Sequence, residues 1–296
     1  MSPITVGLVG IALLILLFLL RMPVAFAMAL VGFAGFAFLT SPEAALSLLS
    51  NDIFGTFTSY PLSVIPMFIL MGTFAFASGI SRRLFQTTYA WIGHRRGGLT
   101  VATVFACAGF GAICGSSTAT AATMGKIALP EMKKYNYDDT LATGTVAAAG
   151  TLGILIPPST ILIVYGYMTE QSIGKLFIAG IVPGILLSIF FAATVAYLCW
   201  RNPGIGPPGA TSSWKERLRA LTGIIEALML FALAIGGLFG GLFSPTQAGA
   251  IGAGGALLIG LARRQLSWQS FIEACKDALL TSCMVIFIIT GAVIFG

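Results

Sequence analysis

Apolar runs long enough to cross a lipid bilayer recur along this chain and limit its possible folds more than any other feature. A transmembrane helix needs about 20 apolar residues to cross about 30 Å of hydrocarbon. Strands in lipid would instead require an alternating pattern and a closed barrel. The chain is therefore predicted to be an all-α polytopic membrane protein, with continuous spans at 4–20, 23–39, 61–80, 176–200, 221–243 and 245–262 and a further span beginning near residue 279.

The composition agrees with membrane insertion and argues against nucleic-acid binding. Hydrophobic residues make up 57% of the chain and charged residues 9%, whereas a soluble domain carries about 25% charged residues. The net charge of +6 comes from basic residues in short loops between the apolar runs, as the positive-inside rule predicts. We therefore expect membrane lipid around the chain and no nucleic-acid partner.

The apolar segment 99–130 is interrupted by the sequence Gly-Ser-Ser-Thr at Gly115 to Thr118. A single crossing by this segment would leave Lys133, Lys134 and most later basic residues outside, against the positive-inside rule. An entry and return on one side puts them all inside. The segment is therefore predicted to be a re-entrant helical hairpin with its tip at Gly115 to Thr118. Two very short spans would give the same orientation, but each half is marginal in length for a crossing.

The same argument predicts that segment 140–168 crosses once, as a helix broken in the middle. Pro157 and Pro158 remove two backbone donors and disfavour helix in the residue before them. Gly150 and Gly153 lower the cost of unwinding just upstream. Unpaired backbone at this depth survives only where it is buried in protein or lines a cavity. This break is therefore a candidate functional site.

The order of segments recurs in opposite orientation, which is typical of secondary transporters. The chain opens with two spans, an amphipathic segment at 43–60 and a span, and the same order returns from Leu221 with an amphipathic segment at 267–278. By symmetry, a complete second copy would bring the chain to roughly 420–430 residues, so we expect the sequence to end within that copy. The predicted parts are first-repeat scaffold spans and arm (1–98), transport elements (99–200, with hairpin 99–130, broken span 140–168 and span 176–200), a cytoplasmic loop (201–220) and the start of the second repeat (221–296).

Neutral oxygens gather at the two interruptions, where they can replace the hydration shell of a cation. No carboxylate lies near either interruption, which favours a monovalent ion such as Na⁺ over Ca²⁺ or Mg²⁺. The predicted sodium ligands are drawn from Gly115, Ser116, Ser117, Gly150, Gly153 and Ile154. The helices that start after the tip and after the two prolines direct their N-terminal dipoles toward mid-membrane, where they can bind an anionic substrate. The predicted substrate-binding residues are Thr118, Thr120, Pro157, Pro158 and Ser159.

A packing role is the alternative for these small residues, because small-xxx-small faces also bring helices close together. Two interrupted segments that are adjacent in sequence favour a site instead. An intramembrane enzyme is not expected, because the sequence has no H-E-x-x-H or G-x-G-D motif and no histidine within a span. A channel is also less expected, since an inverted repeat within one chain favours alternating access.

Several stretches resemble one family, the DctM-like large membrane subunit of tripartite ATP-independent periplasmic (TRAP) transporters, within the ion-transporter superfamily fold. They include IPMFILMGTFAFASGISRRLF, the hairpin GSSTATAATMGKIALPEMKKYNYD, and ILIPPSTILIVYGYMTEQSIGKLFIAGIVPG. Gly115 and Ser116 match the family's hairpin motif, while Gly153 and the Pro-Pro-Ser run match its broken helix. The hairpin departs from the family's common Ser-Gly-Ser, with an Asp four residues on, because Cys114 and Thr120 stand at those positions.

This resemblance implies an elevator-type importer of an organic acid, driven by a sodium gradient, in a bacterial or archaeal inner membrane. It implies two protein partners, a small four-helix membrane subunit and a soluble periplasmic substrate-binding protein. A stand-alone ion-coupled anion transporter of the same fold group remains an alternative, and it would need neither partner.

Overall fold

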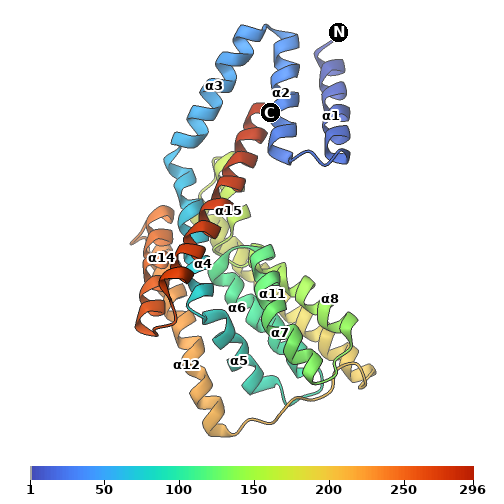
Figure 1. Ribbon diagram of the computed structural model, residues 1–296, viewed down its shortest axis with the longest axis vertical. Helices are drawn as coiled ribbons and strands as arrows, with labels where there is room; N and C mark the ends of the chain where they lie inside the picture. The colour runs from blue at the N-terminus through green and yellow to red at the C-terminus, as the bar shows by residue number, and fades with distance from the viewer. Residues whose placement is uncertain (1) are drawn as a thin grey trace. The chain divides into compact units, whose positions relative to one another are not determined.

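A computed structural model describes residues 2–296, which form helices and no strands (Figure 1). The chain divides into two compact units, Met1–Ser63 with Leu279–Gly296, and Val64–Ala278. The all-helical architecture agrees with the prediction of a polytopic membrane protein. Within residues 2–296, five helices are long and apolar enough to cross a membrane, or six if one bent pair counts as a single span.

The first unit contains α1 (Pro3–Leu19), α2 (Val24–Leu39), α3 (Pro42–Thr58), the short 3-10 helix η1 (Tyr60–Ser63) and the last part of α15 (Trp268–Phe295). Ser2 and Ser41 cap α1 and α3, each followed by a proline in the first helical turn. Glycines allow the backbones of α2 and α15 to meet, because Gly32 lies against Ile294 and Gly291 lies against Ala25. The predicted spans at 4–20 and 23–39 are thus helical, though each is slightly short for a crossing.

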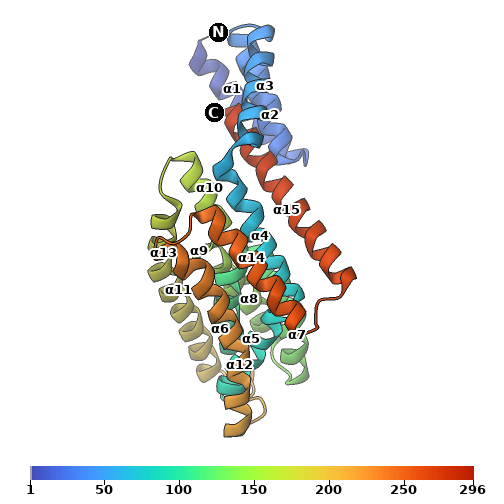
Figure 2. The same cartoon turned by 90° about the vertical axis from the view of Figure 1, so that its left-hand side faces the viewer.

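The second unit is built around one central helix, α6, which packs against α4, α5, α7, α8 and α11. Twelve of its residues are buried, Phe110 and Leu99 among the largest. The helices are α4 (Val64–Ala77), α5 (Ile80–Ile92), α6 (Gly98–Cys114), α7 (Ser117–Lys134), α8 (Asp139–Gly150), α9 (Leu152–Leu155), α10 (Thr160–Met168), α11 (Ile173–Arg201), α12 (Trp214–Phe231), the π-helix η2 (Ala232–Gly236), α13 (Gly237–Phe239) and α14 (Pro245–Ala262). Figure 2 shows α4 and α14 packed side by side.

Both predicted interruptions are present in this unit. The segment 99–130 forms two helices, α6 and α7, that pack against each other with a sharp turn at Gly115 and Ser116. The turn is shorter than predicted, because Ser117 and Thr118 already belong to α7. The segment 140–168 is broken between Leu155 and Thr160, and its two parts are bent by 41°.

One expectation about the last part of the chain is wrong. The amphipathic segment 267–278 and the span from residue 279 were expected as separate elements, but Trp268–Phe295 is one continuous helix of 28 residues. The stretch contains neither proline nor an internal glycine before Gly291, so nothing in it stops the helix where the polarity changes. The predicted division into scaffold and transport elements concerns motion, and it stays a prediction.

A buried carboxylate joins three segments of the second unit. Glu226 of α12 forms an ion pair with Arg83 of α5 at 2.7 Å and a second ion pair with Arg263, which follows α14. Gln265 accepts a further hydrogen bond from Arg83 at 2.7 Å. The Glu226 side chain is 11% exposed and that of Arg263 is 50% exposed. We refer to Arg83, Glu226 and Arg263 as the ionic triad.

Candidate functional site

The hairpin tip is a left-handed glycine followed by a capping serine. Gly115 has φ 66°, a conformation that other residues adopt at a cost. Ser116 is the N-cap of α7, and its Oγ accepts from the Ala119 N–H at 3.3 Å. Thr120 is fully buried and donates its hydroxyl to the Ser116 carbonyl at 2.7 Å. The tip therefore presents one hydroxyl-capped helix start and a buried second hydroxyl.

The broken helix repeats this arrangement at Ser159. Ser159 is the N-cap of α10, with an extended backbone close to that of Ser116, and its Oγ accepts from Leu162 N–H at 3.3 Å. The same hydroxyl donates to the Ile154 carbonyl at 2.5 Å. Ser159, Pro157 and Pro158 are all buried. Two helices thus begin at serine-capped turns directly after the two predicted interruptions, and the turn at Ser159 is buried.

The two turns are hydrogen-bonded to each other, and Thr160 makes the bond. The Thr160 N–H and its Oγ both donate to the Gly115 carbonyl, at 3.2 and 2.9 Å. A Cβ added to Gly115 would lie 2.6 Å from the Pro158 carbonyl oxygen. The N-termini of α7 and α10 therefore meet at one place, which we call the junction.

Glycines let the backbone of α9 approach the hairpin. A Cβ on Gly153 would lie 2.6 Å from Thr120 Oγ and 2.7 Å from the Ser116 carbonyl oxygen. A Cβ on Gly150 would lie 2.7 Å from the Cβ of Ala121, and one on Gly111 would lie 2.8 Å from the Gly153 Cα. Only hydrogen fits at these positions, so their glycines are required for the close approach.

Most of the predicted site residues converge at the junction. The residues that make contacts across it are Gly115, Ser116, Thr120, Gly150, Gly153, Pro158 and Thr160. Thr118 is exposed and bonds Ser116 within the hairpin at 3.2 Å, and Ser117 is half-buried in the first turn of α7. The Gly115 carbonyl accepts two hydrogen bonds from Thr160, and the Ile154 carbonyl accepts one from Ser159. A carbonyl has two lone pairs, so an acceptor position remains on Ile154 but not on Gly115.

Sequence reasoning missed Thr160 and Gly111. Thr160 directly follows Ser159, and its hydroxyl at the start of an apolar helix was a signal that pointed to the same turn. Gly111 lies within an apolar run rich in small residues, where nothing in the sequence distinguishes it from Gly109. Its role follows from its contact with Gly153 in the fold.

The junction is chemically a set of neutral oxygens. The available donors and acceptors are the hydroxyls of Ser116, Thr120, Ser159 and Thr160 and the carbonyls around them. No group of three acidic, histidine or cysteine side chains able to hold a metal ion occurs among residues 2–296. Hydroxyl and carbonyl oxygens suit a hard cation, and two helix N-termini suit an anion.

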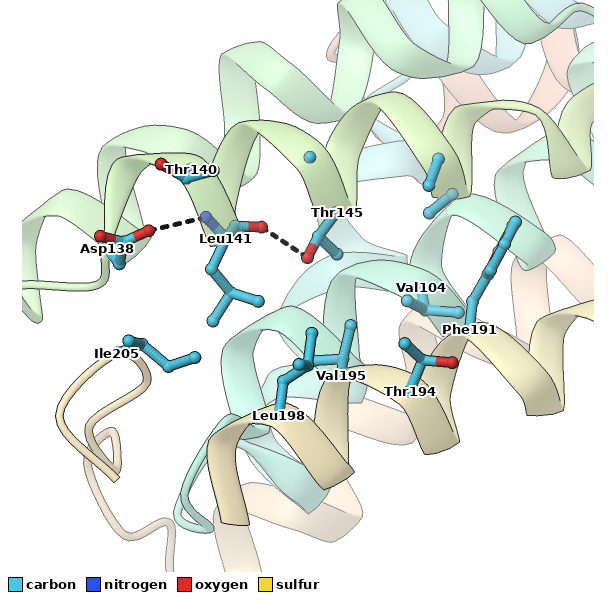
Figure 3. Close-up of a pocket in the computed structure, with 13 residues that line it drawn as sticks. Val104, Asp138, Thr140, Leu141, Thr145, Phe191, Thr194, Val195, Leu198 and Ile205 are labelled. Atoms are coloured by element: carbon cyan, nitrogen blue, oxygen red, sulfur yellow. Dashed lines mark hydrogen bonds between the residues drawn. The ribbon is translucent and has the colours of Figure 1, made fainter. Parts of the chain in front are cut away.

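A separate cavity of about 360 Å³ lies between α6, α8 and α11 (Figure 3). Leu141 points into it from α8, facing Val195 and Leu198 of α11, with Asp138 at one end. Its lining is mainly apolar and includes none of the predicted site residues. The lining residues are Val104, Asp138, Thr140, Leu141, Gly144, Thr145, Ala148, Ala149, Phe191, Thr194, Val195, Leu198 and Ile205. The cavity is therefore distinct from the junction.

Comparison with known proteins identifies relatives that align with most of this chain. The large permease protein DctM of a C4-dicarboxylate TRAP transporter from Pseudomonas aeruginosa is 39% identical over 263 residues, covering 87% of this chain and 60% of that protein. The large permease of an ectoine/5-hydroxyectoine TRAP transporter from Ruegeria pomeroyi is 34% identical over 280 residues, covering 94% of this chain and 65% of the relative.

A sialic acid TRAP transporter large permease from Vibrio cholerae is 32% identical over 276 residues, covering 93% of this chain and 64% of the relative. The chain thus spans about 60% of the length of the Pseudomonas relative. These relatives are named as transporter permeases and not as enzymes. The DctM component of the tripartite ATP-independent periplasmic transporter family matches residues 11–296. With its apolar helices and this match, the chain is a multi-pass membrane protein that belongs to the DctM family.

Proposed function

We propose that this chain is the large membrane subunit of a sodium-coupled TRAP-type transporter that imports an organic acid. The acid is delivered by a periplasmic substrate-binding protein, and a small four-helix membrane subunit completes the transporter in a bacterial or archaeal inner membrane. The single observation that carries the proposal is the junction. Two broken segments meet there through capped helix N-termini and neutral oxygens.

The coupling ion is the first part of the proposal. Sodium binds among the oxygens of Ser116 and Thr120 on the hairpin and Gly153 on the broken helix, which lie against one another. The residual acceptor position on the Ile154 carbonyl adds to this set. Four or more neutral oxygens can replace the water around a monovalent ion without the repulsion that a net positive site would create.

The substrate anion is the second part. The positive dipole ends of α7 and α10 point toward the junction, where the N–H groups of a first helical turn have no partner within their own helix. A carboxylate bound there would contact Thr118, Ser159 and the bound sodium. Binding would then be coupled, because the cation lowers the electrostatic cost of holding the anion in a low-dielectric site.

The mode of movement is the third part. The recurrence of span, span, amphipathic segment and span in opposite orientation supports alternating access. In an elevator mechanism, the hairpin and broken helix carry the junction across the membrane together. The two hydrogen bonds from Thr160 to Gly115 support their movement as one body.

The experiment is uptake into vesicles that contain the complete chain and its small subunit. Radiolabelled C4-dicarboxylates and sialic acid are offered with and without the binding protein, under a sodium or a proton gradient. Ser116→Ala removes the cap hydroxyl. Ser188→Ala is the control, since it removes a serine hydroxyl that donates to the Gly184 carbonyl at 2.7 Å, outside the junction.

We expect uptake to require the binding protein and sodium, and Ser116→Ala to need a higher sodium concentration for half-maximal uptake while Ser188→Ala does not. Uptake that ignores the binding protein would instead identify a stand-alone anion transporter. Uptake that follows a proton gradient alone would contradict sodium coupling.

A further inference from the structure

An aromatic and basic cluster joins the end of α5 to the start of α12, which lie side by side (Figure 1). It consists of Trp91, His94, Trp214 and Arg217, and we call it the aromatic–basic cluster. The two tryptophan rings meet edge to face with centroids 6.2 Å apart. Trp91 Nε1 donates to the Arg217 carbonyl at 3.3 Å, and the Arg217 guanidinium lies 5.4 Å from the Trp214 ring centroid.

Arg217 is a half-buried charge without an anionic partner. Its Nη2 bonds the Nδ1 of His94 at 3.4 Å, and its Nε is buried with no hydrogen-bond partner. Within residues 2–296, no carboxylate forms an ion pair with it, whereas Arg83 on the same helix pair is neutralised by Glu226. Buried charges in proteins are normally paired. The missing counter-charge points to an anionic ligand.

His94 extends the same site by one donor. A guanidinium can only donate hydrogen bonds, so the Nδ1 of His94 accepts from Arg217. The ring proton of that tautomer is then on Nε2, which becomes a second donor beside the guanidinium. Arg95 and Arg96 follow directly and are exposed. The cluster therefore offers several donors and a surplus of positive charge to one small anion.

The position along α12 identifies the source of that anion. Trp214, Leu218 and Ile225 share one face of α12 and are 68%, 60% and 52% exposed, an apolar stripe that lipid would cover. Arg217 lies where this stripe begins, at the end of the span with the basic residues. Tryptophan and arginine at such a boundary lie at the depth of lipid headgroups. The carboxylate of the adjacent residue, Glu216, accepts a hydrogen bond from the Ser213 N–H at 2.7 Å.

We propose that the aromatic–basic cluster binds the phosphate of an anionic phospholipid headgroup. Arg217 and His94 hold the phosphate oxygens, and Trp91 and Trp214 fix the headgroup depth. Basic pockets between transmembrane helices bind anionic headgroups for this reason in other membrane proteins. The proposal is independent of the transported substrate, because the cluster shares no residue with the junction.

Native mass spectrometry of the complete chain with its small subunit tests this proposal. The complex is prepared in detergent that contains phosphatidylglycerol or phosphatidylcholine and is then freed of detergent in the mass spectrometer. The number of lipid molecules that stay bound is measured as the lipid concentration is varied. Arg217→Gln removes the guanidinium. Arg219→Gln is the matched control, because it removes the same charge two residues away, where the side chain is exposed and outside the cluster.

We expect wild type to retain phosphatidylglycerol over phosphatidylcholine, and Arg217→Gln to weaken that retention about fivefold while Arg219→Gln changes it less than about twofold. Millimolar inorganic phosphate should not displace the lipid. Equal retention of the two lipids, equal loss in both variants, or displacement by inorganic phosphate would each overturn the proposal. If Arg217→Gln does not fold, two measurements on the wild type still test the proposal: the preference between the two lipids and the competition with inorganic phosphate.

Discussion

The junction and the ionic triad are two polar regions of one helical unit, built on opposite principles. At the junction, helices are interrupted and every interacting side chain is neutral. In the ionic triad, the helices are continuous or just ended, and one buried carboxylate is shared by two arginines. The triad has its charges matched within the chain. The junction has acceptor oxygens left over, which is what a site for an external cation requires.

The difference predicts distinct responses to mutation. Removing one member of a matched set leaves an uncompensated buried charge, which is costly. Removing one neutral oxygen from the junction costs little stability and should act mainly on ligand binding. Adding volume at the junction should cost more than removing a hydroxyl, because glycine contacts fix the approach of α9 to the hairpin.

The largest expected effect on stability comes from Glu226→Ala in the ionic triad. Breaking a buried pair costs about 3–5 kcal/mol, and the half-exposed Arg263 reduces this to about 2–3 kcal/mol through solvent screening. The melting temperature of the purified protein should fall by about 5–10 °C. Glu216→Gln, an exposed carboxylate whose capping acceptor is kept, is the control and should change little. Similar melting temperatures for both variants would mean that the ionic triad contributes no more to stability than an exposed carboxylate does.

Gly153→Ala should give the next largest effect. The new methyl group would meet the Ser116 carbonyl and Thr120 Oγ, so the backbone of α9 must shift, at a cost of about 1–3 kcal/mol. Substrate uptake should fall with it. Gly144→Ala is the matched control in α8, because nothing lies within 4 Å of its added Cβ. Thermal unfolding and uptake are measured for both. Normal uptake by Gly153→Ala would show that transport does not depend on the close approach of α9 to the hairpin.

Thr160→Val tests the hydrogen bonds that join the two turns. The variant loses the 2.9 Å bond from Oγ to the Gly115 carbonyl but keeps the backbone bond at 3.2 Å. We expect a loss of about 0.5–1.5 kcal/mol in thermal or denaturant unfolding. Thr169→Val, which loses an exposed bond to the Tyr165 carbonyl at the end of α10, should lose less. Equal losses would show that the link across the junction adds no stability of its own.

The smallest effect is expected at a neutral pair outside both regions, Tyr89 and Tyr135. Their hydroxyls bond at 2.8 Å, and burial, followed by this bond, raises the pKa of Tyr89 to about 12. Because the pKa of Tyr89 in the folded protein lies above the ordinary tyrosine value of 10, the stabilising contribution is complete below pH 10 and is lost as the pH rises from 10 toward 12. The Tyr89 side chain is partly exposed, so the contribution is under about 1 kcal/mol.

Tyr89→Phe should therefore flatten the fall in melting temperature between pH 9 and pH 11 relative to wild type. The comparison must be made against each protein's own value at pH 7, because Ala210 N–H also loses its acceptor at 3.2 Å in the variant. An unchanged alkaline slope would show that Tyr89 does not titrate with folding in this range.

Much of the junction could be predicted from the sequence because its signals are local. Proline pairs, left-handed glycines and serines before apolar runs act through the backbone of their own segment. The hairpin, the break and both capped helix starts follow from them. The predicted tip was two residues too long, because Ser117 and Thr118 are good first-turn residues once Ser116 caps the helix.

The ionic triad could not be predicted because its members come from three distant segments. Arg83 and Arg263 each appear in the sequence as one of two adjacent arginines beside an apolar run, and Glu226 as a lone acid within one. Their pairing depends on the packing of α5 against α12 and of α12 against α14. Gly111 escaped prediction for the same reason, since its partner Gly153 lies across the fold. The continuous helix Trp268–Phe295 shows that a change of polarity alone does not end a helix.

The most direct test of the central claim, that neutral oxygens at the junction bind sodium, is sodium-dependent thermal stabilisation. Melting temperatures of the complete chain are measured in rising sodium chloride and in potassium chloride at equal ionic strength. Thr120→Val is compared with Thr145→Val, since both threonines are buried and both donate at 2.7 Å to a carbonyl four residues earlier. Thr145 lies at the apolar cavity and not at the junction.

A ligand that binds only the folded state adds about 2.7 kcal/mol when present at 100 times its Kd. We expect sodium to raise the melting temperature of wild type and Thr145→Val above the value in potassium, and Thr120→Val to need several times more sodium for the same rise. Equal curves in the two salts, or the same sodium response in all three proteins, would contradict the account.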